Sequence, residues 1–332
     1  MSRRKVTTLF LVIFFSFLVW ANLTKPRIMI IHSYATDFMW VREINQGFDR
    51  IFKGRPYMIR WYYLDTKRNP EEDYKTRIGA ACRREVERWR PDILILIDDN
   101  AQSMVGSSFI NRPDISIIFT GLNATAEKYG YDKATNVTGM LERIPFKAVH
   151  EAFSLINSKA RFIHICDSSE TSKAIQAELE EFDWKPLKLV ETKLCPTFDD
   201  WKADVMTANA SADFLLITHY HTIKDATGRV MRPREVLDWT RANATVPLIG
   251  CWDFFVEDGG MLAVSVSPFE QGEEAAKMAV QMIEKGKKPK DMPPIKNLYF
   301  TISMRGGELK SRKIKIPDIF EAFARGVNHY YD

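Results

Sequence analysis

The stretch IMIIHSYATDFMWVREINQGF, residues 28–48, changes character in its middle. A run of apolar residues leads directly into His32, Ser33 and Tyr34, and a charged segment with helical spacing of its apolar residues follows. An uninterrupted apolar run is typical of a strand that is covered on both faces of a parallel sheet. The stretch therefore predicts a strand, a polar turn and a helix, which is the opening unit of an α/β fold.

The same alternation of strand and helix continues in two consecutive halves. Residues 136–145, NVTGMLERIP, stand between the halves, and we interpret them as a segment that crosses from one to the other. We expect two α/β lobes, each with a doubly wound parallel sheet, and a central cleft between them. The strands expected are residues 27–34, 57–66, 92–100 and 115–123 in the first half, and 160–169, 186–194, 213–221, 246–253 and 261–268 in the second.

Length and composition agree with this division. A chain of 332 residues exceeds the usual size of one hydrophobic core, and 45% hydrophobic with 27% charged residues is ordinary for a globular protein. The formal net charge of +4 is too small for a dedicated nucleic-acid binder of this size. We therefore expect no nucleic-acid partner.

The N-terminus has the layout of a secretory signal peptide. In MSRRKVTTLFLVIFFSFLVWANLTKP, three basic residues precede an apolar run, and Val19-Trp20-Ala21 forms an Ala-x-Ala-like cleavage site. We expect residues 1–21 to be the signal peptide and the mature chain to begin near Asn22 in the periplasm or another extracytoplasmic space. The apolar run is shorter than the ~20 residues that span a bilayer, and an uncleaved signal anchor is the alternative.

Export gives the four cysteines two interpretations. An oxidising compartment allows disulfides, and two of the cysteines, at the ends of successive predicted strands, could pair; free buried thiols are the alternative. There is no CxxC motif and no Cys/His cluster, so we expect no metal site, no cofactor and no thiol chemistry. The cysteines are Cys82, Cys166, Cys195 and Cys251.

Candidate binding residues lie just beyond the carboxyl ends of the predicted strands, where open α/β sheets bind ligands. Aromatic rings, hydroxyls, amides and carboxylates occur together there, which suits a small organic molecule with flat apolar and polar parts. Several of the hydroxyl and carboxylate residues also fit simple helix caps, whereas aromatic residues in such turns are harder to explain without a ligand. The candidates are Ser33, Tyr34, Trp40, Asp99, Asn100, Asn123, Ser168, Ser169, Tyr220, Trp252 and Asp253.

Catalysis is the weaker class of function. Asp98 and Asp99 could support metal-assisted hydrolysis, which makes an exported hydrolase one alternative. His219 and His221 share one strand face but have no third metal ligand nearby in sequence. No GxSxG elbow, P-loop or GxGxxG fingerprint follows a predicted strand, so we predict a binding protein and no enzyme.

The sequence resembles a known family in the order and spacing of several segments. These segments are HSY, DILILIDDNA, ISIIFTGLN, NVTGMLERI, CDSSETS and GCWDFF…GGMLAVSVSPFEQGEEAAKMAVQMIEKGKKP. The family is that of ABC-transporter substrate-binding proteins that includes tryptophan-type binders, with the type I periplasmic-binding-protein fold. The resemblance covers about residues 26–325. It implies two lobes that close over one ligand by hinge motion, with crossing segments near residues 139–143, 261–267 and 289–297. The first lobe would then hold residues 22–142 plus about 265–295, and the second 143–264 plus about 296–332.

The resemblance also implies a function. We expect an extracytoplasmic solute-binding protein of an ABC importer, a monomer that binds an amino-acid-like or aromatic solute and delivers it to an ABC permease in the inner membrane. The turn CWDFFVEDGG is bulkier and more aromatic than is usual in the family. The HSY, DDNA and TGLN forms look more like extracytoplasmic sensor domains, so a ligand sensor for a membrane histidine kinase or chemoreceptor is the alternative.

Overall fold

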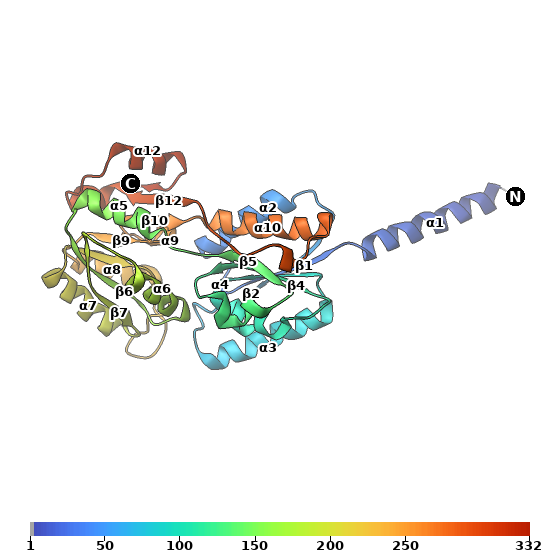
Figure 1. The fold of residues 1–332 in the computed structure, drawn as a ribbon, viewed down its shortest axis with the longest axis horizontal. Coiled ribbons are helices and arrows are strands. Elements are labelled where there is room, and N and C mark those ends of the chain that lie inside the picture. The colour runs from blue at the N-terminus through green and yellow to red at the C-terminus, as the bar shows by residue number, and fades with distance from the viewer. Residues whose placement is uncertain (1–2) are drawn as a thin grey trace.

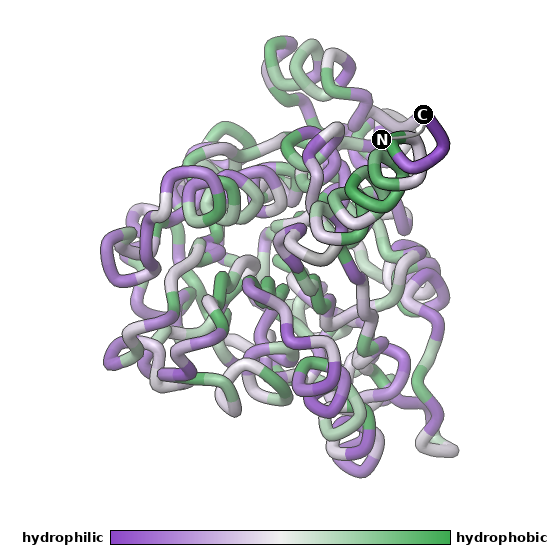
Figure 2. The backbone as a smooth tube through the Cα atoms, turned by 90° about the vertical axis from the view of Figure 1, so that its right-hand side faces the viewer, coloured by the Kyte–Doolittle hydropathy of each residue, from purple (hydrophilic) through white to green (hydrophobic). Residues whose placement is uncertain are grey.

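The computed structural model describes residues 3–332 as two α/β lobes with one helix, α1 (Arg3–Leu23), projecting from the first lobe (Figure 1). Hydrophobic residues, green in Figure 2, run along α1, and residues 3–22 are long and apolar enough to cross a membrane. None of that span is buried against the body, and the two buried hydrophobic clusters begin only at Ile28 and Met29. The body, residues 25–332, therefore has a complete core without α1.

The first lobe is built on a six-stranded sheet in the order β11-β5-β4-β3-β1-β2. All its neighbouring strands pair in parallel, and every residue of the ILILI run of β3 is buried, as expected for a sheet covered on both faces. Its strands are β1 (Arg27–His32), β2 (Met58–Tyr63), β3 (Ile93–Ile97), β4 (Ser116–Leu122), β5 (Val137–Leu141) and β11 (Ile295–Lys296). Its helices are α2 (Met39–Phe52), α3 (Glu72–Trp89), α4 (Asp98–Met104), α10 (Pro268–Lys285) and the 3₁₀ turns η1 (Gly106–Phe109), η2 (Ala126–Tyr129), η3 (Tyr131–Lys133) and η4 (Pro289–Asp291).

The second lobe has a seven-stranded sheet in the order β13-β12-β10-β9-β8-β6-β7. Its strands are β6 (Arg161–Asp167), β7 (Lys188–Cys195), β8 (Phe214–Ile217), β9 (Leu248–Gly250), β10 (Leu262–Val266), β12 (Phe300–Arg305) and β13 (Tyr330–Tyr331). Its helices are α5 (Phe146–Ile156), α6 (Glu170–Glu181), α7 (Phe198–Ser211), α8 (Pro233–Asn243), α9 (Asp253–Glu257), α11 (Gly306–Ser311) and α12 (Asp318–Gly326). The predicted fold class is confirmed, with one difference: β12 pairs antiparallel with β10, because it enters this sheet from the other lobe.

Three segments join the lobes. They follow β5, β10 and β11, since β6, α10 and β12 each belong to the opposite lobe from the strand before them. The sequence interpretation of residues 136–145 as a crossing segment is half wrong, because Val137–Leu141 pairs with β4 as a strand of the first sheet. The crossing begins only at Glu142, which thereby stands at the carboxyl end of a strand.

Helices α2 and α10 lie side by side on one face of the first sheet (Figure 1). They approach through glycines: a Cβ atom placed on Gly272 would lie 2.0 Å from the carbonyl oxygen of Ile44, and one on Gly47 would lie 2.3 Å from that of Phe269. No larger residue fits at this crossing. The close contact fixes α10, which lies far along the chain, onto the first lobe.

The four cysteines are free thiols, and all are buried. Burial raises the pKa of each thiol, so the thiols stay protonated. The pairing of Cys166 with Cys195 that the sequence left open is not formed in this structure.

Candidate functional site

A small chamber lies between the two lobes, and residues from both line it. The space in it that a water-sized molecule can occupy is only about 10 Å³, because the side chains around it almost fill it. From the first lobe come three residues after β1, one after β2 and the polar ends of β3 to β5; from the second come the turns after β6, β8 and β9. The lining residues are Tyr34, Phe38, Trp40, Lys67, Asp98, Asn123, Glu142, Thr171, His219, Trp252 and Phe254.

Two larger clefts open from the chamber to the surface. One has a volume of about 590 Å³ and reaches the region around Met231 and Arg234; the other, of about 260 Å³, is lined by Asn100 and Ser168 among others. Tyr34 and Lys67 line the chamber and both clefts. These two side chains therefore stand where the chamber meets both clefts.

The lobes are closed on one another. The hydroxyl of Tyr34 lies 3.3 Å from the Thr171 hydroxyl of the second lobe, and the phenyl ring of Phe38 packs against the Phe254 ring with centroids 5.1 Å apart. Both contacts bury first-lobe residues against second-lobe residues. The structure thus shows the closed arrangement, in which contacts between buried polar groups are least screened by water.

Asp98 is held in an unusual backbone conformation at the edge of the chamber. Its φ of 64° lies in the left-handed region, which costs free energy for a residue other than glycine and is typical of functional positions. The indole N–H of Trp40 donates to its Oδ1 at 2.9 Å, but its buried Oδ2 has no hydrogen-bond partner in residues 3–332. Burial, followed by the nearby charge of Glu142, raises the pKa of Asp98 well above its usual range.

Glu142 is a second buried carboxylate of the chamber. The indole N–H of Trp252 donates to its Oε1 at 2.8 Å, and the Asn123 amide donates to its Oε2 at 2.9 Å. Burial raises the pKa of Glu142 to about 8, and the charge of Asp99 adds to that increase. The amide oxygen of Asn123 has no partner in the described part of the chain, so it is a further open acceptor.

Lys67 places a cation among these groups. Its Nζ lies 4.4 Å from the ring centroid of Tyr34 and 5.2 Å from that of Phe38, which are cation–π distances. Burial lowers the pKa of Lys67, and the charges of Asp167, Asp98 and Glu142 partly oppose this. The chamber thus holds one cationic side chain against two carboxylates with raised pKa.

Two neutral histidines belong to the second lobe, His219 in the wall of the chamber and His221 in the wall of the 590 Å³ cleft. The ring of His219 lies 4.5 Å from the Trp252 ring, and that of His221 lies 4.9 Å from the Phe254 ring. Burial, followed by the charge of Lys67, lowers the pKa of both histidines well below the usual value. Their Nδ1 atoms have no hydrogen-bond partner among the described residues, so each can donate to or accept from a solute.

Of the candidate residues from the sequence, Tyr34, Trp40, Asn123 and Trp252 line the chamber. The structure brings these four together, as the strand-end rule implies. Asn100, Ser168 and Ser169 lie instead along the 260 Å³ cleft, where Ser169 also caps α6 by accepting from the backbone N–H of Ser172. Contact of these residues with a solute stays a prediction.

Ser33 and Asp99 have structural roles and do not line the chamber or its clefts. The Ser33 hydroxyl donates to the carbonyl of Ile97 at 2.7 Å and accepts from the N–H of Ala101 at 2.9 Å, so it joins β1 to α4. Asp99 is buried and accepts from the Tyr129 hydroxyl at 2.8 Å and from backbone N–H groups of the η2 loop. The polar atoms of both residues are thus already engaged within the first lobe, and contact of either residue with a solute stays a prediction.

Tyr220 and Asp253 also point away from the chamber. Tyr220 is fully buried, and its hydroxyl donates to the Asp258 carboxylate at 2.8 Å. Asp253 accepts from the hydroxyl of Thr301 at 2.8 Å and faces the C-terminal segment. Side chains alternate in direction along an extended turn, so the neighbours His219 and Trp252 face the chamber instead, and His221 faces the 590 Å³ cleft.

Seven of the eleven lining residues were not among the binding candidates from the sequence: Phe38, Lys67, Asp98, Glu142, Thr171, His219 and Phe254. Lys67 follows β2, whose carboxyl end was not considered, and Glu142 follows β5, which was interpreted as a crossing segment. Applied to those two strands, the same strand-end rule would have found both charges. Phe38 and Thr171 lie one turn further on, at the starts of α2 and α6, and no local signal marks them.

Comparisons with known proteins identify the family. Residues 67–327 match the family model described as ABC transporter substrate binding protein. No curated protein matches the sequence significantly.

Solved structures share the fold at low identity. A conserved domain protein from Vibrio cholerae is 18% identical with a TM-score of 0.70, over 90% of this chain and 98% of that chain. An ABC domain in complex with L-Trp from Streptococcus pneumonia is 17% identical with a TM-score of 0.68, over 89% and 98%. A ligand-free, open substrate-binding protein with adhesive properties from Clostridium difficile is 16% identical with a TM-score of 0.63, over 88% and 96%.

The family model spans most of the chain, and these structures share its two-lobed fold over nearly their whole length. The resemblance inferred from the sequence is thereby confirmed. The chain belongs to the family of ABC transporter substrate-binding proteins.

Proposed function

We propose that this chain is the extracytoplasmic binding component of an ABC importer and that it takes an amino-acid-like or aromatic solute carrying an ammonium group. The observation that carries the solute class is the buried Oδ2 of Asp98, which has no hydrogen-bond partner within residues 3–332. A buried carboxylate oxygen without a donor costs free energy, and a solute ammonium would supply that donor.

The aromatic rings around Asp98 support the same class. Tyr34, Trp40, Phe38, Trp252 and Phe254 surround the carboxylates of the chamber, and the faces of aromatic rings attract cations. The ammonium of Lys67 already lies over two of these rings. The position of the Lys67 ammonium indicates where the ammonium of a solute would lie, because both are cations and the same ring faces would attract them.

The flat part of the solute would stack in the same wall. Trp252 and Phe254 are stacked with centroids 6.0 Å apart and an interplanar angle of 13°, and His219 lies against Trp252. The closed chamber offers a water-sized molecule only about 10 Å³, so a solute would enter the open form and displace Lys67 and Phe38 before the lobes close. Closure then removes water from the polar contacts and strengthens them.

The proposed location and partner follow from the family and from α1. An apolar helix that the body does not cover suits a signal peptide, which places the body outside the cytoplasm. The partner we propose is the membrane permease of the importer. A sensor kinase would be an alternative partner for the same module.

A thermal-shift panel on the body, residues 25–332, tests the solute class. Amino acids including L-Trp, aromatic amines, aromatic acids without an amino group, and sugars are compared, since a ligand that binds only the folded state raises the melting temperature. We expect saturable shifts from amino-bearing aromatic compounds and none from sugars. Asp98→Asn should abolish the shift, while Asp132→Asn, an exposed carboxylate on η3, should leave it unchanged.

Two results would reject the proposed class. Saturable shifts from sugars alone would reject an ammonium-bearing solute, and shifts that survive Asp98→Asn would remove Asp98 from the site. Uptake of the labelled solute by cells that lack the gene separates an importer from a sensor. Loss of uptake supports the importer, whereas normal uptake with loss of a transcriptional response supports the sensor.

A further inference from the structure

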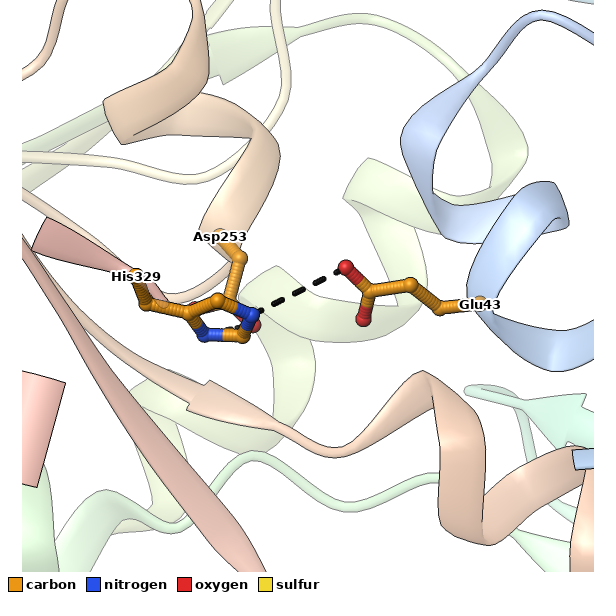
Figure 3. A group of neighbouring side chains, drawn as sticks. All are labelled: Glu43, Asp253 and His329. Carbon is orange, nitrogen blue, oxygen red and sulfur yellow. Dashed lines mark ion pairs between the residues drawn. The ribbon is translucent and has the colours of Figure 1, made fainter. Parts of the chain in front are cut away.

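Glu43, Asp253 and His329 form a cluster behind the solute chamber. Each offers one ligand atom, and these atoms lie within 4.8 Å of one another. His329 Nε2 is 3.9 Å from Glu43 Oε1, and its Nδ1 is 3.4 Å from Asp253 Oδ2. Figure 3 shows Glu43 reaching from α2 toward the other two residues, which come from α9 and from the segment before β13. The cluster therefore joins the first lobe to the second.

The cluster is separate from the solute chamber. A small cavity lined by Glu43 and Asp253 is also lined by Trp40 and Trp252, whose rings line the chamber too. The two indoles thus stand between the cluster and the solute. None of the three cluster residues lines the chamber or its two clefts.

Negative charge exceeds positive charge around the cluster. The carboxyl groups of Glu43, Asp253 and Glu257 lie near one another. Arg42 is engaged with Glu257 at 3.1 Å, and Arg305 donates to the carbonyl of Val256 at 2.8 Å. A bound cation would compensate carboxylates that these arginines leave uncompensated.

The second-lobe ligands are already held in position. Asp253 accepts hydrogen bonds from the hydroxyls of Thr301 and Ser303, which leave lone pairs of its carboxylate free. The backbone of His329 is fixed on both sides, because its N–H donates to Ala324 at 2.8 Å and its carbonyl accepts from Met304 at 3.0 Å. Such supporting hydrogen bonds are what orient ligands in known metal sites.

We propose that Glu43, Asp253 and His329 bind a divalent transition-metal ion of the Zn²⁺ type. An imidazole with two carboxylates favours Zn²⁺ and its neighbours over Mg²⁺ and Ca²⁺, which prefer oxygen ligands alone. In tetrahedral Zn²⁺ sites the ligand atoms lie about 3.4 Å apart, so ligand atoms that lie within 4.8 Å of one another here would move together when the ion binds. A fourth position stays open for water.

Such an ion would act as a latch between the lobes. One ligand belongs to the first lobe and two to the second, so the complete site exists only when the lobes are closed. A ligand that binds one conformation shifts the population toward it. The ion would therefore favour closure and increase solute affinity, whatever the solute is. Sequence spacing could not reveal this site, because its three residues are far apart in the chain.

Isothermal titration of the metal-free body with ZnCl₂ tests the site. We expect one Zn²⁺ per chain, and affinity about tenfold or more weaker in Glu43→Gln and in His329→Gln. The matched control is His150→Gln on α5, since His150 is the other histidine that is not fully buried. Circular dichroism and thermal melting of each variant without metal establish that it is folded. MgCl₂ and CaCl₂ should bind far more weakly.

The latch has a separate readout. Small-angle scattering of the solute-free body should show a smaller radius of gyration with Zn²⁺ than without it, and Glu43→Gln should remove that difference. Zn²⁺ binding that is absent, or that is lost in His150→Gln and retained in His329→Gln, would overturn the site. Binding that needs only the second-lobe residues and leaves the radius unchanged would overturn the latch. Neither result depends on finding the solute.

Discussion

Trp252 of the second lobe donates its indole N–H to Glu142, where the first crossing segment begins, over 2.8 Å. Both side chains are buried, and the Asn123 amide donates a hydrogen bond to the other carboxylate oxygen of Glu142. One hydrogen bond thus connects the aromatic wall of the second lobe to the hinge side of the first. Loss of this bond should affect closure as well as stability.

Trp252→Phe should lower the free energy of unfolding by about 1–3 kcal/mol, because it leaves a buried carboxylate oxygen without its donor while keeping an aromatic ring. Urea denaturation of the body measures this. Trp239→Phe on α8 is the control, since the indole nitrogen of Trp239 donates no hydrogen bond seen within residues 3–332. Equal losses in both variants would assign the effect to ring size alone.

The stability of the body should depend on the protonation of Glu142. The folded-state pKa of about 8 lies above the ordinary glutamate value, so the folded state holds a proton that the unfolded state has released. Stability from this group is therefore complete at acid pH and is lost as pH rises toward 8. Relative to Glu142→Gln, the wild-type body should lose on the order of 3 kcal/mol between pH 5 and 8.

Urea denaturation at several pH values gives this difference in the free energy of unfolding. The contributions of other titrating groups cancel, because these groups are present in both the wild type and Glu142→Gln. The exposed Glu151→Gln on α5 should follow the wild type throughout. Parallel stability curves for wild type and Glu142→Gln would mean that Glu142 titrates normally in the folded protein.

Lys67→Met should raise the affinity for an ammonium-bearing solute about tenfold. The change removes the cation that lies over Tyr34, and with it the repulsion between that cation and the ammonium of the solute, which is worth a few kcal/mol at about 4 Å. Calorimetric titration with the solute found in the panel measures the change. A fall in affinity would show that Lys67 binds a carboxylate of the solute.

Gly272→Ala should destabilise the body by about 1–3 kcal/mol or more, because the new methyl group would meet backbone atoms of α2 that cannot move aside. Thermal and urea unfolding measure the loss. Gly326→Ala is the matched control: it has open space around its Cβ position and ordinary φ, and it should be neutral or slightly stabilising. Similar losses at both positions would contradict close packing of α2 on α10.

The two lobes could be predicted from the sequence because buried parallel strands give long apolar runs, as in the ILILI of β3. β5 was not predicted as a strand because its sequence, VTGML, contains a glycine that weakens the strand pattern. That glycine is required by the tertiary structure: a Cβ on Gly139 would lie 2.1 Å from the carbonyl oxygen of Phe119. Only the packing of the sheet around position 139 explains why this residue is a glycine.

The candidate site was predicted in part for a similar reason. Tyr34, Asn123 and Trp252 follow strands and line the chamber, as the strand-end rule requires. The rule places a residue near the cleft but does not fix the direction of its side chain, so Tyr220 and Asp253 were included although they face the interior of the second lobe. Direction depends on packing partners that lie far away in the sequence.

The first sheet is completed by parts of the chain that lie far beyond its other strands, namely α10 and β11. A nascent chain lacking residues 268–296 has an unpaired edge at β5 and no helix over the glycine face of α2. The N-terminal half therefore cannot reach its final packing before residues 268–296 have been synthesised. The first lobe is completed only after most of the second lobe has left the ribosome.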